Sequence, residues 1–181
     1  MPAWDVITGQ QIALGLLAAE RHRMRTGEGQ LVSIALADVA MATLGNLGYV
    51  AEAMINDSDR EALGNHIYGT YGHDFECADG ERVMVVGVSA NQWQALVDVT
   101  GTADGIARLE QRMGLDLRRE GDRYQAREAI TDLFRPWFAQ RRFELVATAL
   151  DNAGACWGRY QTMKEAVGRD PDCSVDNPLF Q

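Results

Sequence analysis

The sequence predicts an α/β fold in two parts, and two patterns support this prediction. Residues 1–55 read as a helix, a short apolar strand and a second helix, which is the succession typical of α/β layers. Further along, Asp79-Gly80 stands between two runs of β-forming residues, the pattern of a β-hairpin, and several helices follow it. At 181 residues the chain is long enough for one domain or for parts of two.

The first predicted helix has a candidate cap and an apolar surface. Thr8-Gly9-Gln10-Gln11 has the form of a capping box, so the helix is expected to begin there. It becomes basic after Glu20 and is expected to end at Gly27. Because its first half is apolar on nearly every side, we expect it to be buried on more than one face.

The next two predicted elements complete the first part. Residues 30–36 form a short apolar run that reads as a buried, parallel strand. Asp38 is expected to start a second helix that continues towards Ile55. A turn-rich stretch then extends to Gly72, so we place a domain boundary near residue 56.

The second part begins with the hairpin, predicted over residues 75–86. Ser89 is expected to cap a helix that ends at Gly101, and residues 102–152 show a helical pattern. Pro136 marks either a kink or the start of a new helix. Residues 156–160 are expected to be extended, and the final residues to form a connector.

Composition excludes several classes of function. The net charge of -9 and the pI of about 4.8 disfavour binding to nucleic acid or to an anionic membrane. The apolar run at residues 12–19 is too short to span a bilayer. The cysteines show no CxxC spacing, so neither a disulfide framework nor a zinc site is expected, and a cytoplasmic protein is predicted.

Asp5 is the strongest catalytic candidate. It is expected just before a helix N-terminus, where backbone N–H groups and the helix dipole stabilise negative charge. A carboxylate kept ionised there can act as a nucleophile and form a covalent acyl intermediate. The alternative is an aspartate that only caps the helix.

Two sets of motifs, in register along the chain, resemble one known family. The first set is Trp4-Asp5-Val6-Ile7-Thr8-Gly9, an Ala/Leu-rich helix ending in Glu20-Arg21, then Arg25-Thr26-Gly27-Glu28-Gly29-Gln30 and Ala37-Asp38-Val39. The second set is Gly64-Asn65, Tyr68-Gly69, Phe75, Asp79-Gly80, Gln92-Trp93 and Phe134-x-x-Trp137. Together they are similar to the central segment of the class III CoA-transferases, a family that includes the α-methylacyl-CoA racemases.

The resemblance implies a fold and a division into domains. Residues 1–55 would be a partial Rossmann-like segment of a large domain, residues 56–155 a small α+β domain, and residues 156–181 a connector that returns towards the large domain. Members of the family are longer and form interlaced dimers. The resemblance therefore implies a central fragment whose partner is a second copy or a missing N-terminal half. An alternative is an inactive fragment that acts only as an association module.

The resemblance also implies a chemistry. In the family the aspartate of a D-x-x-x-G element is the catalytic carboxylate, and Asp5 holds the matching position. In the transferases this group attacks an acyl-CoA thioester and forms an aspartyl anhydride, whereas in the racemases it exchanges a proton at the α-carbon. CoA thioester is then the substrate, and no permanently bound cofactor is expected. Within the family the motifs look most similar to members that move CoA between the two carboxyls of one unsaturated diacid.

The loop at residues 64–74 is the second candidate site. Formyl-CoA transferases carry consecutive glycines here that cover the reacting centre, whereas this chain interleaves glycines with aromatic residues and histidines. Donors on such a loop would hold a distal carboxylate, and an ordinary surface loop is the alternative. The candidate residues of this loop are Gly64, Asn65, His66, Tyr68, Gly69 and Tyr71.

The remaining candidates are weaker. Arg21, Arg23 and Arg25 are expected to form a solvated helix end, with contact to CoA phosphates as the alternative. His66 and His73 lack the spacing of a metal site, so no metal is expected. Three aromatic residues at helical spacings are expected to pack in the core, namely Trp93, Trp137 and Phe143.

Overall fold

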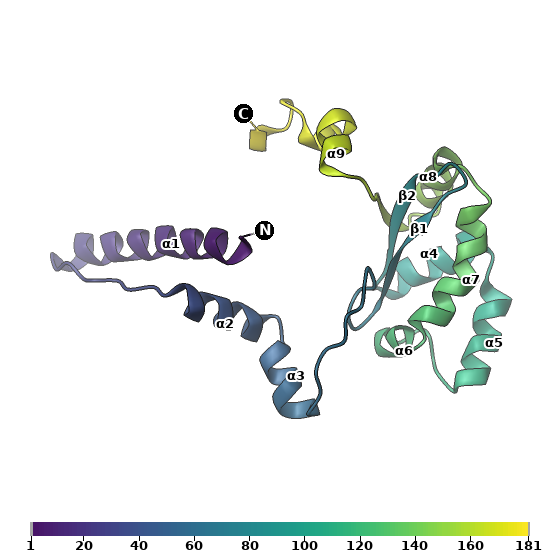
Figure 1. The fold of residues 1–181 in the computed structure, drawn as a ribbon, viewed down its shortest axis with the longest axis horizontal. Helices are drawn as coiled ribbons and strands as arrows, with labels where there is room; N and C mark the ends of the chain where they lie inside the picture. The colour runs from purple at the N-terminus through teal and green to yellow at the C-terminus, as the bar shows by residue number, and fades with distance from the viewer. Residues whose placement is uncertain (1, 181) are drawn as a thin grey trace. The chain divides into compact units, whose positions relative to one another are not determined.

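The structure, a computed structural model, describes residues 2–180. Contacts divide the chain into two compact units, Met1–Ala62 and Leu63–Gln181, here called the N-terminal and C-terminal units (Figure 1). The expected division into domains at residues 1–55, 56–155 and 156–181 stays a prediction.

The N-terminal unit consists of three helices. They are α1 (Ala3–Thr26), which packs against α2 (Leu36–Asn46), and α3 (Tyr49–Asn56). Helix α1 begins at Ala3, so the predicted start at Thr8 is wrong: Thr8 lies inside the helix, and its buried hydroxyl makes no hydrogen bond to any residue that the structure describes. The predicted end is confirmed, because Gly27 takes a left-handed φ of 78° and its N–H donates to the carbonyl of Arg23.

The predicted strand is wrong. Residues 28–35 form no strand, and the Leu31 side chain is 93% exposed. A strand is stabilised by hydrogen bonds to a neighbouring strand, and none of the described residues pairs with this run. The predicted burial of α1 on several faces is also wrong, because Leu16 and Leu17 remain 69% and 62% exposed and Thr8 is the one buried residue among those described in this helix.

The predicted second helix is two helices. Helix α2 begins at Leu36, two residues before Asp38, and ends near Gly48, which has a φ of 85°. A residue in the left-handed region ends regular helical hydrogen bonding, and glycine adopts this region without a steric penalty. Helix α3 therefore starts at a new angle after Gly48.

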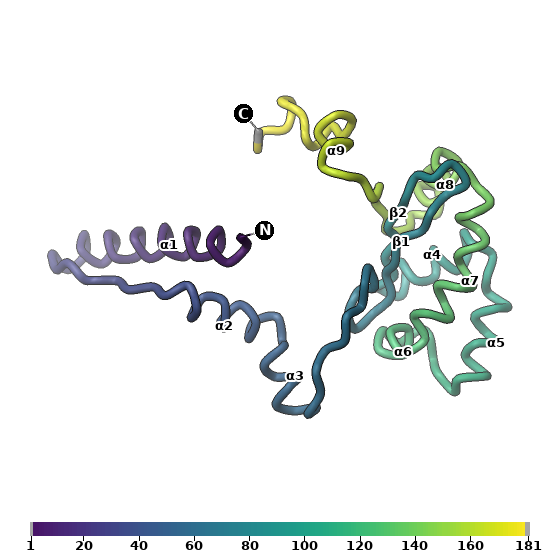
Figure 2. The backbone as a smooth tube through the Cα atoms, viewed as in Figure 1, coloured from purple at the N-terminus to yellow at the C-terminus, as the bar shows by residue number. Residues whose placement is uncertain are grey.

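The C-terminal unit is built on a three-stranded antiparallel sheet. Its strands are β1 (Tyr71–Glu76), β2 (Arg82–Gly87) and β3 (Cys156–Arg159), in the order β1-β2-β3. The predicted hairpin is confirmed: Glu76 pairs with Arg82, and Gly80 takes a φ of 80° in the turn. The first strand begins at Tyr71, four residues earlier than predicted. The chain passes through α4 to α8 before β3 returns to the sheet (Figure 2).

The helices of this unit agree largely with the sequence pattern. Ser89 and Gln92 form a capping box, and Gly101 ends that helix in a left-handed conformation, as predicted. Pro136 lies inside a helix, which excludes the alternative of a new helix start. The helices are α4 (Ala90–Thr100), α5 (Ala103–Met113), α6 (Glu120–Gln125), α7 (Arg127–Ala139), α8 (Phe143–Asn152) and α9 (Met163–Arg169), followed by short 3-10 turns at Pro171–Cys173 and Pro178–Phe180.

The core of the unit lies between the sheet and its helices. Helix α7 packs against β1, and α4 packs against β2 (Figure 1). Alternate strand residues enter this layer, because successive side chains of a strand point to opposite faces. Trp93 and Phe143 are each 4% exposed and Trp137 packs against the core, as expected. The fully buried aromatic and aliphatic residues include Tyr71, Val83, Val85, Leu96, Ile130, Phe134, Phe138, Val146 and Leu150.

The hairpin turn also caps a helix far along the chain. Both carboxylate oxygens of Asp79 accept a hydrogen bond from the backbone N–H of Phe143, at 3.2 and 3.1 Å. This N–H belongs to the first turn of α8, where backbone donors have no partner within the helix. Asp79 thus joins the hairpin turn to α8.

Among the described residues, none of the helices has the length and apolar character needed to span a membrane.

Candidate functional site

Asp5 lies in the first turn of α1, with its side chain exposed. The prediction placed it just before the helix, and the difference arises because α1 starts five residues before the predicted cap. The electrostatic argument is unchanged, since a carboxylate in the first turn still faces the positive end of the helix dipole. Pro2 at the N-cap supplies no side-chain hydrogen bond. Asp5 is therefore an accessible carboxylate at an electrostatically favourable position.

The three basic candidates lie at the other end of the same helix. Arg21, Arg23 and Arg25 are exposed, with Arg23 and Arg25 in the last turn. A rise of 1.5 Å per residue separates Asp5 from Arg21 by about 24 Å along the axis. Helix α1 thus does not bring these arginines to the carboxylate. Their positions suit a solvated helix end.

The candidate loop runs from Gly64 to Thr70 and is held by short-range turns. The N–H of His66 donates to the carbonyl of Leu63, and the N–H of Ile67 to the carbonyl of Gly72, each at 3.1 Å. Gly64 and Gly69 have φ values of 57° and 78°. Both candidate glycines thus occupy the left-handed region, where a residue with a side chain would strain the backbone.

Asp74 anchors this loop to the hairpin. Its carboxylate is 2% exposed and accepts hydrogen bonds from Arg82 and from the Asn65 amide, the latter at 2.9 Å. Burial by itself raises the pKa of Asp74, but the hydrogen bonds from Arg82 and Asn65 and the charge of Arg82 outweigh it, so the pKa lies below its usual value. Asn65, a candidate residue, is thereby fixed at the start of the loop.

His66 stacks on His73 beside this anchor. The ring centroids are 4.2 Å apart and the planes differ by 18°. His66 Nε2 lies 3.2 Å from a carboxylate oxygen of Glu128 on α7, and the His66 side chain is 7% exposed. Burial, followed by the neighbouring His66, lowers the pKa of His73. His66 is thus engaged inside the unit.

The two candidate tyrosines of the loop have different environments. Tyr68 is 42% exposed, and its ring meets the edge of Tyr124 on α6 at 5.3 Å. Tyr71 is the first residue of β1, is fully buried, and its hydroxyl lies 3.1 Å from that of Thr131. Tyr68 is therefore the candidate tyrosine whose side chain reaches the surface, while Tyr71 is a core residue.

Sequence reasoning missed the anchor made by Asp74 and Arg82. A signal for it existed in the hairpin dipeptide, because a turn at Asp79-Gly80 pairs Glu76 with Arg82 and makes Asp74 its diagonal neighbour. The contacts of His66 with Glu128 and of Tyr68 with Tyr124 had no comparable signal, since they join segments far apart along the chain.

Within residues 2–180, no group of three His, Cys, Asp or Glu side chains is arranged to hold a metal ion.

Comparison with known proteins identifies the family. The sequence model of CoA-transferase family III matches residues 1–177. The chain belongs to CoA-transferase family III. This match includes both Asp5 and the loop at residues 64–74, the two candidate regions of this family III chain.

Curated relatives of this family III chain act on CoA thioesters. The chain is 54% identical to the 2-methylfumaryl-CoA isomerase of Chloroflexus aurantiacus, over 99% of this chain and 44% of that protein. It is 29% identical to the succinyl-CoA:mesaconate CoA-transferase of Haloarcula hispanica, over 75% of this chain and 32% of that protein. The chain thus spans less than half the length of these relatives.

Solved structures agree on the fold. A hypothetical protein from Mycobacterium tuberculosis superposes with a TM-score of 0.68 at 21% identity, over 94% of this chain and 43% of that protein. A second crystal form of that protein gives the same TM-score at 23% identity. The family III chain, with mixed helices and a small antiparallel sheet, is therefore similar in fold to less than half of a solved protein.

Proposed function

We propose that this chain carries the nucleophile of an intramolecular CoA transfer, in which CoA moves between the two carboxyl groups of 2-methylfumaryl-CoA (mesaconyl-CoA). The 54% identity to a 2-methylfumaryl-CoA isomerase is the observation that carries this proposal, compared with 29% to a succinyl-CoA:mesaconate CoA-transferase, which by its name moves CoA between two different acids. Asp5 supports it, because it is an exposed carboxylate in the first turn of a 24-residue helix, where the helix dipole favours negative charge.

The reaction begins with attack of an Asp5 carboxylate oxygen on the thioester carbonyl carbon. The C–S bond breaks, CoA leaves as the thiolate with the bonding pair, and a mixed anhydride between Asp5 and the acyl group remains. The thiolate then attacks the Asp5 carbonyl carbon and breaks its bond to the first carboxylate, which frees the diacid and leaves an Asp5 thioester. The diacid turns over, its second carboxylate attacks the same carbon, and the thiolate leaves again, so that the anhydride now holds the second carboxyl. Attack of the thiolate on the newly activated carbonyl forms the isomeric thioester and releases the Asp5 carboxylate. No redox step and no second acid is needed.

In this proposal Tyr68 recognises the carboxylate that is not bound to CoA. Tyr68 is half-exposed on the loop, whereas His66 and Tyr71 are buried against other side chains. Its phenolic O–H donates a hydrogen bond to a carboxylate oxygen, a charge-assisted interaction. The glycines at 64 and 69 give the loop the backbone geometry that presents this side chain.

We further propose that the N-terminal unit completes a Rossmann-like layer with segments present in the longer relatives, from a missing N-terminal half or a second copy. The unpaired run at residues 28–35 and the exposed leucines of α1 support this, because each lacks within the described residues the neighbour that its sequence pattern requires. CoA thioester is the substrate, and the reaction takes place in the cytoplasm.

A chimera tests the chemistry. This chain replaces the matching segment of the Chloroflexus aurantiacus isomerase, and conversion of 2-methylfumaryl-CoA to its isomer is followed by chromatography. Asp5→Asn should lower kcat at least about 1,000-fold, since loss of a nucleophile removes the covalent route. Hydroxylamine should attack the anhydride in the unsubstituted chimera, release the acyl group and convert the Asp5 side chain to its hydroxamate, which mass spectrometry detects.

Asp38→Asn is the matched control, because Asp38 is also an exposed aspartate in the first turn of a helix. Normal turnover in the Asp5→Asn chimera, with no trapped intermediate, would overturn the proposal. Solvent deuterium appearing at the α-carbon of a saturated 2-methylacyl-CoA, without CoA exchange, would instead show the racemase chemistry. An inactive unsubstituted chimera would leave association as the function of the chain.

A further inference from the structure

Two neighbouring residues at the start of β2 hold two different segments of the C-terminal unit. Glu81 and Arg82 follow the hairpin turn, and their side chains leave the chain in opposite directions, as successive residues of an extended chain do. Glu81 contacts the segment at residues 159–170, here called the return segment. Arg82 contacts Asp74 and, through it, the candidate loop.

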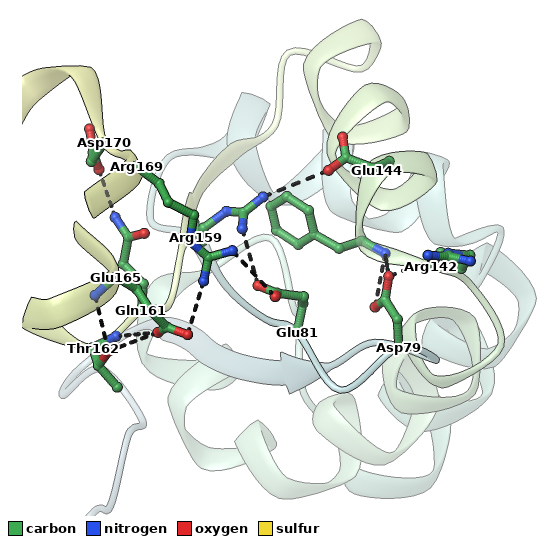
Figure 3. Close-up of polar contacts among 11 residues, drawn as sticks. Asp79, Glu81, Arg142, Glu144, Arg159, Gln161, Thr162, Glu165, Arg169 and Asp170 are labelled. Carbon is green, nitrogen blue, oxygen red and sulfur yellow. Dashed lines mark hydrogen bonds and ion pairs between the residues drawn. The ribbon is translucent and has the colours of Figure 1, made fainter. Parts of the chain in front are cut away.

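Glu81 fixes the return segment by ion pairs. Its carboxylate lies 3.1 Å from an Arg159 nitrogen and 3.6 Å from an Arg169 nitrogen, and these three side chains border a groove of about 560 Å³ (Figure 3). Within the return segment, Gln161 donates to Asp170 at 2.7 Å, which closes the segment on itself around α9. Two arginines on one carboxylate thus set where α9 lies against the hairpin.

Arg82 fixes the loop through a buried carboxylate. Its guanidinium donates to one oxygen of Asp74, and the other oxygen accepts from the Asn65 amide at 2.9 Å. Because Asp74 is 2% exposed, its charge requires these donors, and breaking them is costly. The Asn65 amide nitrogen is therefore held strongly on Asp74 of the hairpin.

The Tyr160 hydroxyl joins the return segment to the loop. The Tyr160 hydroxyl donates to the Asn65 carbonyl oxygen at 3.2 Å, and the Tyr160 backbone N–H donates to the carbonyl of Arg82 at 3.0 Å. Tyr160 belongs to the return segment, between Arg159 and Gln161. The Asn65 side chain thereby uses both ends of its amide, one on Asp74 and one on Tyr160.

We propose that Tyr160 and Asn65 couple the candidate loop to the return segment, and that they act as positioning residues for Tyr68. A shift of α9 moves Tyr160, which moves the Asn65 side chain and the loop that begins there. The role in positioning Tyr68 rests on the proposed function. The coupling itself rests on the hydrogen bonds among Tyr160, Asn65 and Asp74.

Amide hydrogen exchange on the 181-residue chain, resolved by NMR, tests the coupling. The His66 and Ile67 amides report on the loop, because each donates a backbone hydrogen bond there. Tyr160→Phe removes only the hydroxyl and should raise their exchange rates about two- to fivefold, the size expected for one exposed hydrogen bond. Arg169→Gln loosens α9 from Glu81 and should raise exchange both in α9 and in the loop.

The double variant is decisive, because coupled residues give non-additive effects. In the Tyr160→Phe background, Arg169→Gln should still raise exchange in α9 but leave the His66 and Ile67 rates unchanged. Equal effects of Arg169→Gln on the loop in both backgrounds would overturn the coupling, as would a Tyr160→Phe chain with wild-type loop rates. Tyr49→Phe, a hydroxyl loss in the N-terminal unit, is the control.

A purely structural role gives a different pattern. General loosening of the C-terminal unit would raise exchange at the β1 and β2 amides by the same factor as in the loop, whereas positioning raises the loop rates alone. No catalysis enters this measurement. An inactive chimera would therefore overturn the proposed function and leave the coupling standing. Unchanged exchange rates in the loop would overturn the coupling and leave the proposed function standing.

Discussion

His66 and His73 form a stacked pair inside the C-terminal unit. The Nδ1 atom of each ring is buried and has no hydrogen-bond partner in the part of the chain that the structure describes. The groups that face His73 are Asp74 on its own strand and Glu128 and Arg135 on α7. Burial, then the neighbouring His66, lowers the pKa of His73, and the two carboxylates offset this only in part.

The stability of the unit therefore depends on the protonation of His73. Its folded pKa lies below the 6.5 of the unfolded chain, so the unfolded state binds a proton more readily. The stability contributed by neutral His73 is complete above pH 6.5. It is lost as the pH falls through the lower folded pKa.

Substitution of His66 tests this assignment. His66→Gln removes the neighbouring imidazole and should raise the pKa of His73 towards 6.5, measured from the ring C–H resonance in an NMR titration. His22→Gln is the control, since His22 is exposed on α1. An unchanged or lower pKa of His73 in the His66→Gln chain would contradict the stacked arrangement.

At the scale of elements, the loop at residues 64–70 packs directly on β1. Gly72 is the second residue of β1, and a Cβ placed there would lie 2.8 Å from the Ile67 Cγ1 atom. Ile67 also donates its N–H to the Gly72 carbonyl. The close approach of these two segments thus requires a residue without a side chain.

Gly72→Ala should displace Ile67 and lower the free energy of unfolding by about 1–3 kcal/mol, the range for overpacking a tight site. Urea denaturation measures the change. Gly158→Ala is the matched control on β3, because nothing lies within 4 Å of the added Cβ there. A Gly72→Ala chain as stable as the Gly158→Ala chain would show that the loop does not pack on β1.

At the scale of the whole molecule, the N-terminal unit exposes apolar side chains that its helices do not cover. Leu14 and Leu17, one helical turn apart on α1, are 60% and 62% exposed, and Leu31 is 93% exposed. Apolar surface of this kind marks association sites. The net charge of -9 makes copies of the chain repel one another at long range, but the apolar side chains remain exposed to solvent.

We expect the chain to self-associate as its concentration rises, in sedimentation velocity experiments. Leu17→Glu should weaken this association about tenfold or more, since burial of one leucine contributes about 1.5–3 kcal/mol. Gln10→Glu adds the same charge at an exposed polar position of α1 and should leave association nearly unchanged. Equal weakening by both substitutions would point to charge repulsion, and a wild-type chain that stays monomeric would contradict the expectation.

Much of the fold could be predicted because its signals are local. Gly27, Gly101 and Asp79-Gly80 mark chain reversals through backbone conformation, and Ser89 marks a helix start through a hydrogen bond three residues away. Each of these depends on a few neighbouring residues. The start of α1 was mistaken because Thr8-Gly9-Gln10-Gln11 matches a capping box, while the residues before it also continue the helix.

The candidate site divides in the same way. Asp5 was found from its motif, and its place in the first turn of α1 follows from residues beside it in sequence. The turn glycines before Tyr71 predict a loop residue, yet Tyr71 lies in β1 and packs against Trp93 and Phe134. No local pattern distinguishes a tyrosine on a loop from one on a strand covered by helices.

The sequence by itself determined the family, the candidate nucleophile Asp5, the hairpin and most helix ends, because each depends on a motif or on a short-range conformational preference. The tertiary structure alone decided that Tyr68 is exposed while Tyr71 is buried, that the Asn65 amide donates to Asp74, and that Tyr160 contacts the loop. The two hydrogen bonds join residues 9 and 95 positions apart. Their formation depends on how the sheet and helices pack, which short-range preferences do not specify.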